Sequence, residues 1–148
     1  MMEAIKTGGR FVLHGLDSLS SVVSLIIRLY VANVFWKSGM TKIASWDTTL
    51  ALFENEYAVP LLPSDVAAVL GTGAELFFPV LLFLGLGTRF AAFALFVLNI
   101  IAVISYPDLS EAGRAEHLYW GMLLLVPIFY GPGKISIDQY LRRKWLGV

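Results

Sequence analysis

The chain of 148 residues contains no cysteine. Disulfide frameworks, CxxC redox centres, cysteine-ligated iron–sulfur clusters and c-type haem attachment are therefore excluded. Charge is also scarce, because only 15% of the residues are charged, whereas a soluble domain has about 25%. The formal net charge is zero, so the chain lacks the basic surface by which proteins bind nucleic acid, and no nucleic-acid partner is expected.

The chain is rich in long apolar segments. Hydrophobic residues make up 57% of it, and the mean hydropathy is +0.73. Four apolar segments have nearly the length of about 20 residues that crosses a hydrocarbon core of about 30 Å: residues 21–40, 66–86, 90–106 and 115–130. The very short turn before residue 90 forces two of them to run antiparallel. We predict one domain, residues 1–148, that is all-α and integral to the membrane, built as an antiparallel bundle of four transmembrane helices.

The loop between the first two predicted spans has an apolar pattern of its own. Leu50, Phe53 and Tyr57 follow one another at i, i+3 and i+7, which is the spacing of one helix face. Residues 47–57 are therefore predicted to form a short surface helix in the first outer loop, lying on the bilayer.

The distribution of basic residues predicts the orientation. With the N-terminus inside, the inner segments carry seven lysines and arginines: Lys6, Arg10, Arg89, Lys134, Arg142, Arg143 and Lys144. The outer loops then carry only Lys42 and Arg114. Because lysine and arginine are enriched in cytoplasmic loops, both termini are predicted to be cytoplasmic.

Polar residues interrupt three of the predicted spans. Glu75 lies near the middle of the second span, where a charged residue costs about 2.5–3.5 kcal/mol on an insertion scale. The first span carries Arg28, Asn33 and Lys37, and the third carries Asn99. At about 1.5 Å per residue, Arg28 and Glu75 differ in depth by only about 5 Å. We predict that Glu75 is ionised and paired with Arg28 or Lys37, with Asn99 hydrogen-bonded nearby.

These polar residues have two interpretations. They either fix the register of the helices or line a site for a polar headgroup or a proton. His117, at the start of the fourth span, is either an interfacial hydrogen-bonding residue or, because histidine titrates near neutral pH, a proton relay or quinone ligand. No metal site and no catalytic residue are predicted. The candidates for a ligand site or polar cluster are Arg28, Asn33, Lys37, Glu75, Asn99, His117 and Trp120.

Several of these residues belong to short motifs in a definite order. The motifs are Arg28, Phe35-Trp-Lys-Ser-Gly39-Met-Thr-Lys42, Glu75, Gly85-Leu-Gly-Thr-Arg89, His117-Leu-Tyr-Trp120 and Gly131-Pro-Gly-Lys-Ile-Ser136-Ile-Asp138. In this order and spacing, from about residue 24 to residue 141, the chain resembles the DoxX family of small four-span bacterial membrane proteins. The resemblance implies a four-helix bundle that crosses the bacterial inner membrane several times.

The resemblance implies a role linked to membrane oxidoreductase complexes, since some relatives belong to quinone-linked or redox-stress systems. The first hypothesis is therefore a subunit of a redox system, not an enzyme on its own, that holds a quinone or a partner protein near Arg28, Glu75 and His117. The second is a non-catalytic scaffold or maturation factor that docks a partner through its acidic outer loop or its basic tail, with the surface helix Asp47 to Tyr57 carrying the contact. The third is a small transporter, because a charge at the midplane marks substrate paths. The expected partners are the lipid bilayer and either another protein or further copies of the chain.

Overall fold

The computed structural model describes the backbone of residues 2–147 and the side chains of residues 15, 16 and 19–147. Over this range the chain is helical, with turns and loops between the helices and no strand. The helices are α1 (Met2–Ala44), α2 (Trp46–Asn55), α3 (Ser64–Leu84), α4 (Thr88–Ser105), α5 (Glu111–Phe129) and α6 (Ile137–Leu146). The prediction of an all-α protein is confirmed.

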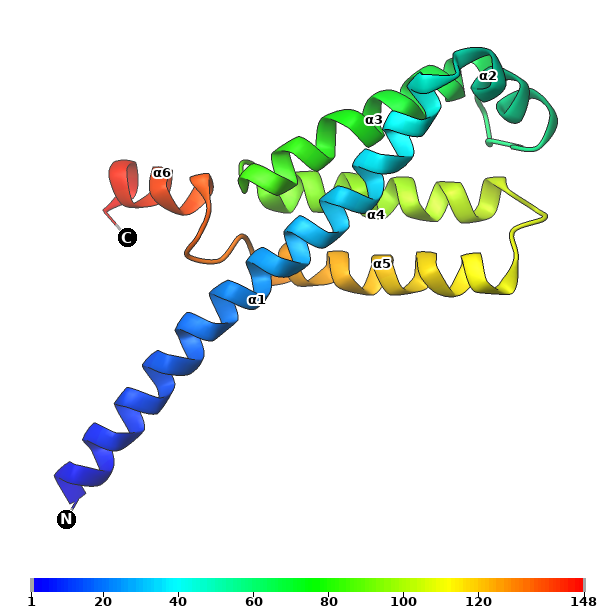
Figure 1. Cartoon of the computed structure of the whole chain (residues 1–148). Helices are drawn as coiled ribbons and strands as arrows, with labels where there is room; N and C mark the ends of the chain where they lie inside the picture. The colour runs from blue at the N-terminus through cyan, green and yellow to red at the C-terminus, as the bar shows by residue number, and fades with distance from the viewer. Residues whose placement is uncertain (1, 148) are drawn as a thin grey trace.

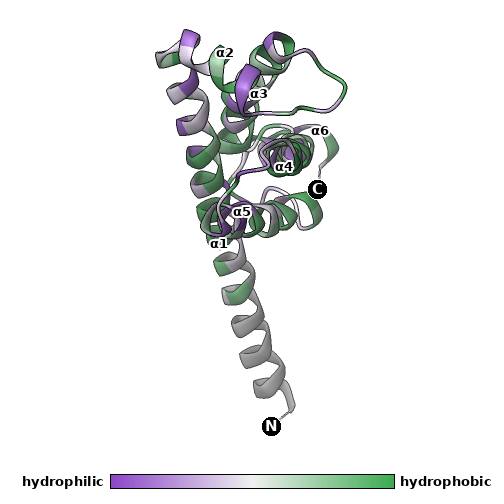
Figure 2. Cartoon of the chain, turned by 90° about the vertical axis from the view of Figure 1, so that its right-hand side faces the viewer, coloured by the Kyte–Doolittle hydropathy of each residue, from purple (hydrophilic) through white to green (hydrophobic). Residues whose placement is uncertain are grey.

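Three helices in the described part of the chain are long and apolar enough to cross a membrane. They are α3, α4 and the stretch Leu19–Ala44 of α1, with mean hydropathies of 1.9, 2.0 and 1.6. Figure 2 shows apolar residues along these helices and more polar ones where α2 lies. The fourth predicted span corresponds to α5, whose first two turns carry Glu111, Arg114 and Glu116, and α5 is not among the three. The chain is therefore a helical protein of the lipid bilayer.

The helices α1, α3, α4 and α5 pack around one apolar core. Its buried members are Val31, Ala32, Phe35, Leu82, Ala91, Ala92, Leu95 and Leu124. Figure 1 shows α3, α4 and α5 lying side by side, with α1 crossing them obliquely. We call the end of this group next to α2 the α2 end, and the opposite end, next to α6, the α6 end.

The first helix is longer than predicted. The span was expected at residues 21–40, but α1 is continuous from Met2 to Ala44. At about 1.5 Å per residue it is about 65 Å long, and its N-terminal part extends away from the other helices (Figure 1). Because the helix does not end at Met40, Lys42 belongs to α1 and not to a loop.

The short helix predicted for residues 47–57 is present as α2, but its apolar face does not lie on the bilayer. Phe53 is 7% exposed and packs with Ala67 and Ala68 of α3. Tyr57 stacks on Phe53 with ring centroids 4.8 Å apart, and on Tyr106 at 5.2 Å. The first turns of α3 carry small alanines and so leave room for these rings, which is why the apolar face of α2 packs on protein.

Arg28 lies at the α6 end and does not pair with Glu75, so that predicted pairing is wrong. Its guanidinium is buried and donates to the backbone oxygens of Leu82 at 3.1 Å and Ile135 at 2.5 Å, with a longer contact of 3.5 Å to the oxygen of Phe83. The last carbonyls of a helix have no partner within it, and they attract a cation. Arg28 therefore stabilises the C-terminus of α3, about two helical turns away from Glu75.

Asp138 ties the start of α6 to the turn between α3 and α4. Its carboxylate accepts hydrogen bonds from the backbone nitrogens of Gly87 and Thr88, each at 2.8 Å, and its own nitrogen donates to the oxygen of Gly85 at 2.8 Å. The two carboxylate oxygens of Asp138 accept from free N–H groups at the start of α4, and they place a negative charge at the positive end of that helix.

Replacing Asp138 with alanine is expected to lower the free energy of unfolding by about 1–2 kcal/mol, as for other lost helix caps. Thermal unfolding of the detergent-solubilised protein, followed by circular dichroism, measures the change. Asp108→Ala, on the exposed turn before α5, is the matched control and should change it by less than about 0.5 kcal/mol. Equal effects of the two substitutions would contradict the capping role.

Candidate functional site

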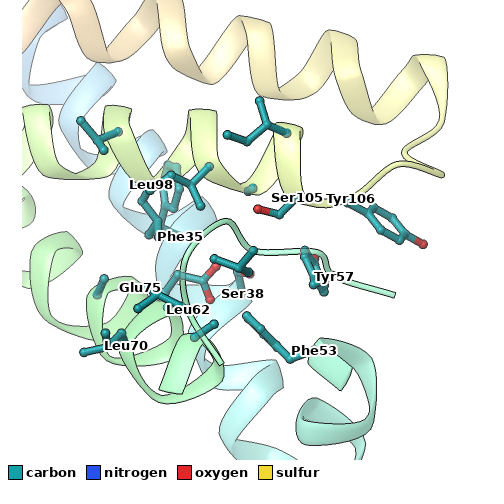
Figure 3. A pocket seen from close by; sticks show the side chains of 18 of the residues that line it. Phe35, Ser38, Phe53, Tyr57, Leu62, Leu70, Glu75, Leu98, Ser105 and Tyr106 are labelled. Atoms are coloured by element: carbon teal, nitrogen blue, oxygen red, sulfur yellow. The ribbon is translucent and has the colours of Figure 1, made fainter. Parts of the chain in front are cut away.

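A cavity of about 670 Å³ lies at the α2 end, between α1, α3, α4 and α5 and beside the loop 58–63. Most of its lining is apolar, including Phe35, Leu70, Leu98 and Ile101. Figure 3 shows this lining, with Glu75 and Ser38 on one side and Ser105 and Tyr106 on another. The volume lies in the range of about 300–1,000 Å³ that is usual for sites that bind small molecules.

An ion pair between α1 and α3 borders the cavity. Lys42 Nζ lies 2.6 Å from Glu75 Oε2, and these side chains are only 13% and 12% exposed. Lys42 also donates to Ser38 Oγ, one turn earlier on α1, at 2.9 Å. The predicted partners of Glu75, Arg28 and Lys37, are both wrong, because α1 continues beyond Met40 and presents Lys42 to α3.

Gly39 allows α1 and α3 to approach closely where the pair forms. A Cβ atom at this position would lie 2.8 Å from Leu76 Cδ2 and 3.1 Å from Glu75 Cβ. Real Cβ atoms essentially never approach other heavy atoms closer than 3.0 Å, so a side chain at Gly39 would require either the Leu76 side chain or the two helices to shift. Small residues commonly permit such close packing of membrane helices. The glycine therefore sets the distance over which Lys42 reaches Glu75.

Asn99 and His117 form a second polar pair, between α4 and α5. Asn99 Nδ2 donates to the backbone oxygen of His117 at 2.9 Å, and His117 Nδ1 lies 2.7 Å from Asn99 Oδ1. The backbone oxygen only accepts, so the amide nitrogen must face it and Oδ1 must face the ring. His117 Nδ1 therefore carries a proton, and in the neutral ring Nε2 is left as an acceptor. Asn99, expected beside the Glu75 ion pair, is hydrogen-bonded to His117.

Two further polar groups line the cavity: Ser105, at the end of α4, and Tyr57, just after α2. Ser105 Oγ is buried and has no hydrogen-bond partner among residues 2–147. Burial raises the pKa of the Tyr57 phenol, and the negative charge of Glu75 raises it further, so this hydroxyl stays protonated and able to donate at neutral pH. The backbone nitrogen of Ala58 donates to the oxygen of Ser105 at 2.7 Å, which anchors the loop to the end of α4.

The residues predicted from the sequence are divided by the fold. Glu75, His117 and Trp120 border the cavity. Asn99 is not in its lining but is hydrogen-bonded to His117. Arg28 lies at the α6 end, and Asn33 and Lys37 are exposed on the surface of α1.

The polar residues at the cavity that were not among the predicted candidates include Lys42, Tyr57 and Ser105. For Lys42 a signal existed, because it closes the motif that begins at Phe35, but it was assigned to an outer loop. Tyr57 and Ser105 reach the cavity only through the packing of α2 and its following loop on α3 and α4, which no local pattern reveals.

Fold and site together define a helical membrane protein with a mainly apolar cavity beside a buried ion pair. The family model of DoxX matches residues 23–107, and the chain belongs to the DoxX family. It is also similar to an uncharacterized protein of Haemophilus influenzae, with 32% identity over 133 residues that cover 84% of this chain and 86% of that protein. No solved structure matches the chain at a significant level.

Proposed function

We propose that the chain is a multi-pass subunit of a redox-linked system in the bacterial inner membrane and that its cavity binds a ligand of the quinone class. The observation that carries the proposal is the cavity itself, which combines apolar walls with Lys42, Glu75 and His117 at its border. A quinone has a flat apolar ring with oxygen atoms at opposite edges. Sites for such amphiphilic molecules are mostly apolar, with a few polar groups that fix the orientation.

The polar side chains at the cavity have hydrogen-bonding capacity left for the carbonyl oxygens of a quinone. An ammonium group has three N–H donors, and Lys42 uses one on Ser38 and one on Glu75. The third is available to donate to a carbonyl oxygen. His117 Nε2 has no hydrogen-bond partner among the described residues, and in the neutral ring it would accept from the hydroxyl of a reduced ring. Ser105 Oγ would donate to or accept from the same ligand.

When bound, a quinone would supply reversible two-electron, two-proton chemistry. The residues of this chain would bind and orient it: Lys42 by donating to an oxygen, and the apolar walls by excluding water from the ring. Glu75 would keep Lys42 charged and in place. His117 would accept a hydrogen bond at Nε2 from the hydroxyl of the reduced ring.

The proposal includes a placement in the membrane. In it α5 is the fourth span, and both termini are cytoplasmic, so the cavity lies in the outer half of the bilayer. The packing of α5 against both α1 and α4 supports the fourth span. The basic residues Arg142, Arg143 and Lys144 on α6 support the orientation, because positive charge favours the cytoplasmic side.

The scaffold hypothesis has less support. It named the acidic outer loop or the basic tail as the docking surface, with the helix Asp47 to Tyr57 carrying the contact. In that helix and its end, however, Phe53 is buried against α3 and Tyr57 borders the cavity. These side chains are therefore turned away from the partner that the hypothesis required.

Quenching of tryptophan fluorescence tests the proposal, because Trp120 borders the cavity with its ring 4.9 Å from that of His117. Titration of the purified protein with a short-chain ubiquinone analogue is expected to give saturable quenching. Lys42→Met should weaken binding about tenfold or more, as a lost charged hydrogen bond does. Lys37→Met, on the exposed face of the same helix, is the matched control and should leave binding unchanged.

A cavity-filling substitution separates binding from stability. Ala102→Phe adds a ring inside the cavity and should abolish saturable quenching in protein that still elutes and unfolds as a folded species. Unsaturable quenching in the wild type would overturn the proposal. Equal affinities of wild-type, Lys42→Met and Ala102→Phe protein would show that the analogue binds elsewhere.

A further inference from the structure

The cavity at the α2 end reaches the surface of the molecule between α3 and α4. Among the described residues that line it, those that are exposed are Pro60, Leu61, Leu62, Leu70, Val97 and Ile104. All of them belong to α3, α4 or the loop 58–63. The lining residues that α1 and α5 contribute are instead buried or half-buried. The cavity is therefore closed towards α1 and α5 and open between α3 and α4, and we call this opening the mouth.

The mouth exists because α3 and α4 separate along their length. Near their common turn the two helices are in contact, since the rings of Phe78 and Phe90 pack edge to face with centroids 5.7 Å apart. Towards the α2 end the helices move apart, as Figure 1 shows. There the end of α4 is joined to the loop by the hydrogen bond from the nitrogen of Ala58 to the oxygen of Ser105. The loop 58–63 therefore forms the rim of the mouth at the α2 end.

The mouth faces lipid and not water. Its exposed side chains are all apolar, so a water-soluble molecule would find no polar group at the entrance. At about 1.5 Å per residue, Leu70 lies about 9 Å from the start of α3 and Val97 about 12 Å from the end of α4. Both helices are long and apolar enough to cross a membrane. These two side chains therefore border the hydrocarbon core.

The polar groups of the cavity lie inside it and not at the mouth. Lys42 and His117 come from α1 and α5, on the closed side. Ser105 is only 1% exposed, its hydroxyl has no hydrogen-bond partner among the described residues, and Figure 3 shows the hydroxyl directed into the cavity. A buried hydroxyl without a partner is unfavourable unless a ligand or water satisfies it. The cavity therefore suits a molecule with a polar end inside and an apolar end at the mouth.

We infer that the ligand of this cavity carries an apolar tail that leaves through the mouth and lies between α3 and α4 in the bilayer. The inference rests on the proposed binding of a quinone and adds the class of quinone, one with an alkyl or prenyl tail that reaches the site from the membrane. The ring would contact Lys42, His117 and Ser105 inside the cavity. Because lipid is as apolar as the mouth, burial of the tail adds little affinity, and the mouth acts by fixing which way the ring faces.

Two quinones that differ in the tail test the inference. They are decylubiquinone, which has an alkyl tail, and a tetrasubstituted dimethoxy-dimethylbenzoquinone, which has none. Val97→Phe narrows the mouth and is expected to raise the dissociation constant of decylubiquinone about tenfold, because added volume in a packed path is costly. It should leave that of the tailless quinone unchanged. Saturable quenching of tryptophan fluorescence measures both constants, and the ratio of variant to wild type cancels the partition of each compound into detergent.

Ile100→Phe is the matched control, because Ile100 is also an exposed residue of α4 but does not line the cavity. This substitution should change neither dissociation constant. Leu70→Phe narrows the mouth from α3 and should repeat the selective loss of decylubiquinone, so the test does not depend on the folding of one variant. Thermal unfolding of each variant, followed by circular dichroism, checks that the protein is folded.

Two results would overturn the inference alone. One is equal affinity of wild-type, Val97→Phe and Leu70→Phe protein for decylubiquinone, and the other is an equal loss of affinity for both quinones. In either case, saturable binding of the tailless quinone to the wild type would leave the proposed quinone site standing. Absence of saturable binding of either quinone to the wild type would overturn the proposed site and the inference together.

Discussion

Replacing Lys42 with methionine is expected to lower the free energy of unfolding by about 3–5 kcal/mol, the range for removing one partner of a buried ion pair. The substitution leaves the Glu75 carboxylate among apolar side chains with its closest partner gone, while methionine keeps most of the packing of the lysine stem. Because the two side chains retain 13% and 12% exposure, the value should lie near the lower end of that range. Unfolding in mixed detergent micelles, followed by circular dichroism, measures it.

A double-mutant cycle tests whether the loss comes from the ion pair. Glu75→Met alone should lower the free energy of unfolding less than Lys42→Met does, because the long lysine side chain can reach the membrane surface when its partner is removed. The double variant with methionine at both positions should recover to within about 1 kcal/mol of the wild type, since apolar replacements of buried pairs are often neutral. Additive losses in the double variant would show that Lys42 and Glu75 are not coupled.

Gly85→Ala should lower the free energy of unfolding by about 3–5 kcal/mol, because it combines backbone strain with a steric clash. Gly85 ends α3 with φ of +69°, in the left-handed region that favours glycine. A Cβ atom here would lie 2.5 Å from Arg28 Nη1, 2.6 Å from Ser136 Cβ and 3.1 Å from Ser136 Cα. The substitution would therefore displace the guanidinium from the end of α3 and the backbone that leads into α6.

Gly87→Ala is the matched control for this prediction. Gly87 has φ of +55° in the same turn, but a Cβ atom there would meet nothing within 4 Å. Gly87→Ala should therefore lower the free energy of unfolding by only about 1–2 kcal/mol, the backbone cost of an alanine in the left-handed conformation. Thermal unfolding of both variants under one condition gives the comparison, and equal losses would mean that the contact with Arg28 and Ser136 contributes nothing.

The helices were predictable because apolar length and turn residues are local signals. The positions of α3 and α4 follow from continuous apolar runs separated by Gly85 and Gly87, and α2 follows from the spacing of Leu50 and Phe53. The face that α2 turns towards α3 was not predictable in this way. A surface that is apolar enough to lie on a bilayer is also apolar enough to pack on protein, and only the tertiary arrangement distinguishes the two.

The pairing of charges was harder to predict for a related reason. A comparison of residue depths along two helices holds only where the helices lie parallel, and the predicted first span ended at Met40. Helix α1 instead crosses α3 obliquely and continues to Ala44 (Figure 1), so Lys42 and not Lys37 meets Glu75. Arg28 was matched to a carboxylate, although the exposed carbonyls at the end of α3 are an equally good partner for a guanidinium.

The continuity of α1 has a mechanical consequence. One uninterrupted helix without proline carries Arg28 at the α6 end and Lys42 beside the cavity, about 21 Å apart along its axis. Arg28 contacts the last carbonyls of α3, and Lys42 borders the cavity. A displacement of α1 along its axis would therefore move both contacts together.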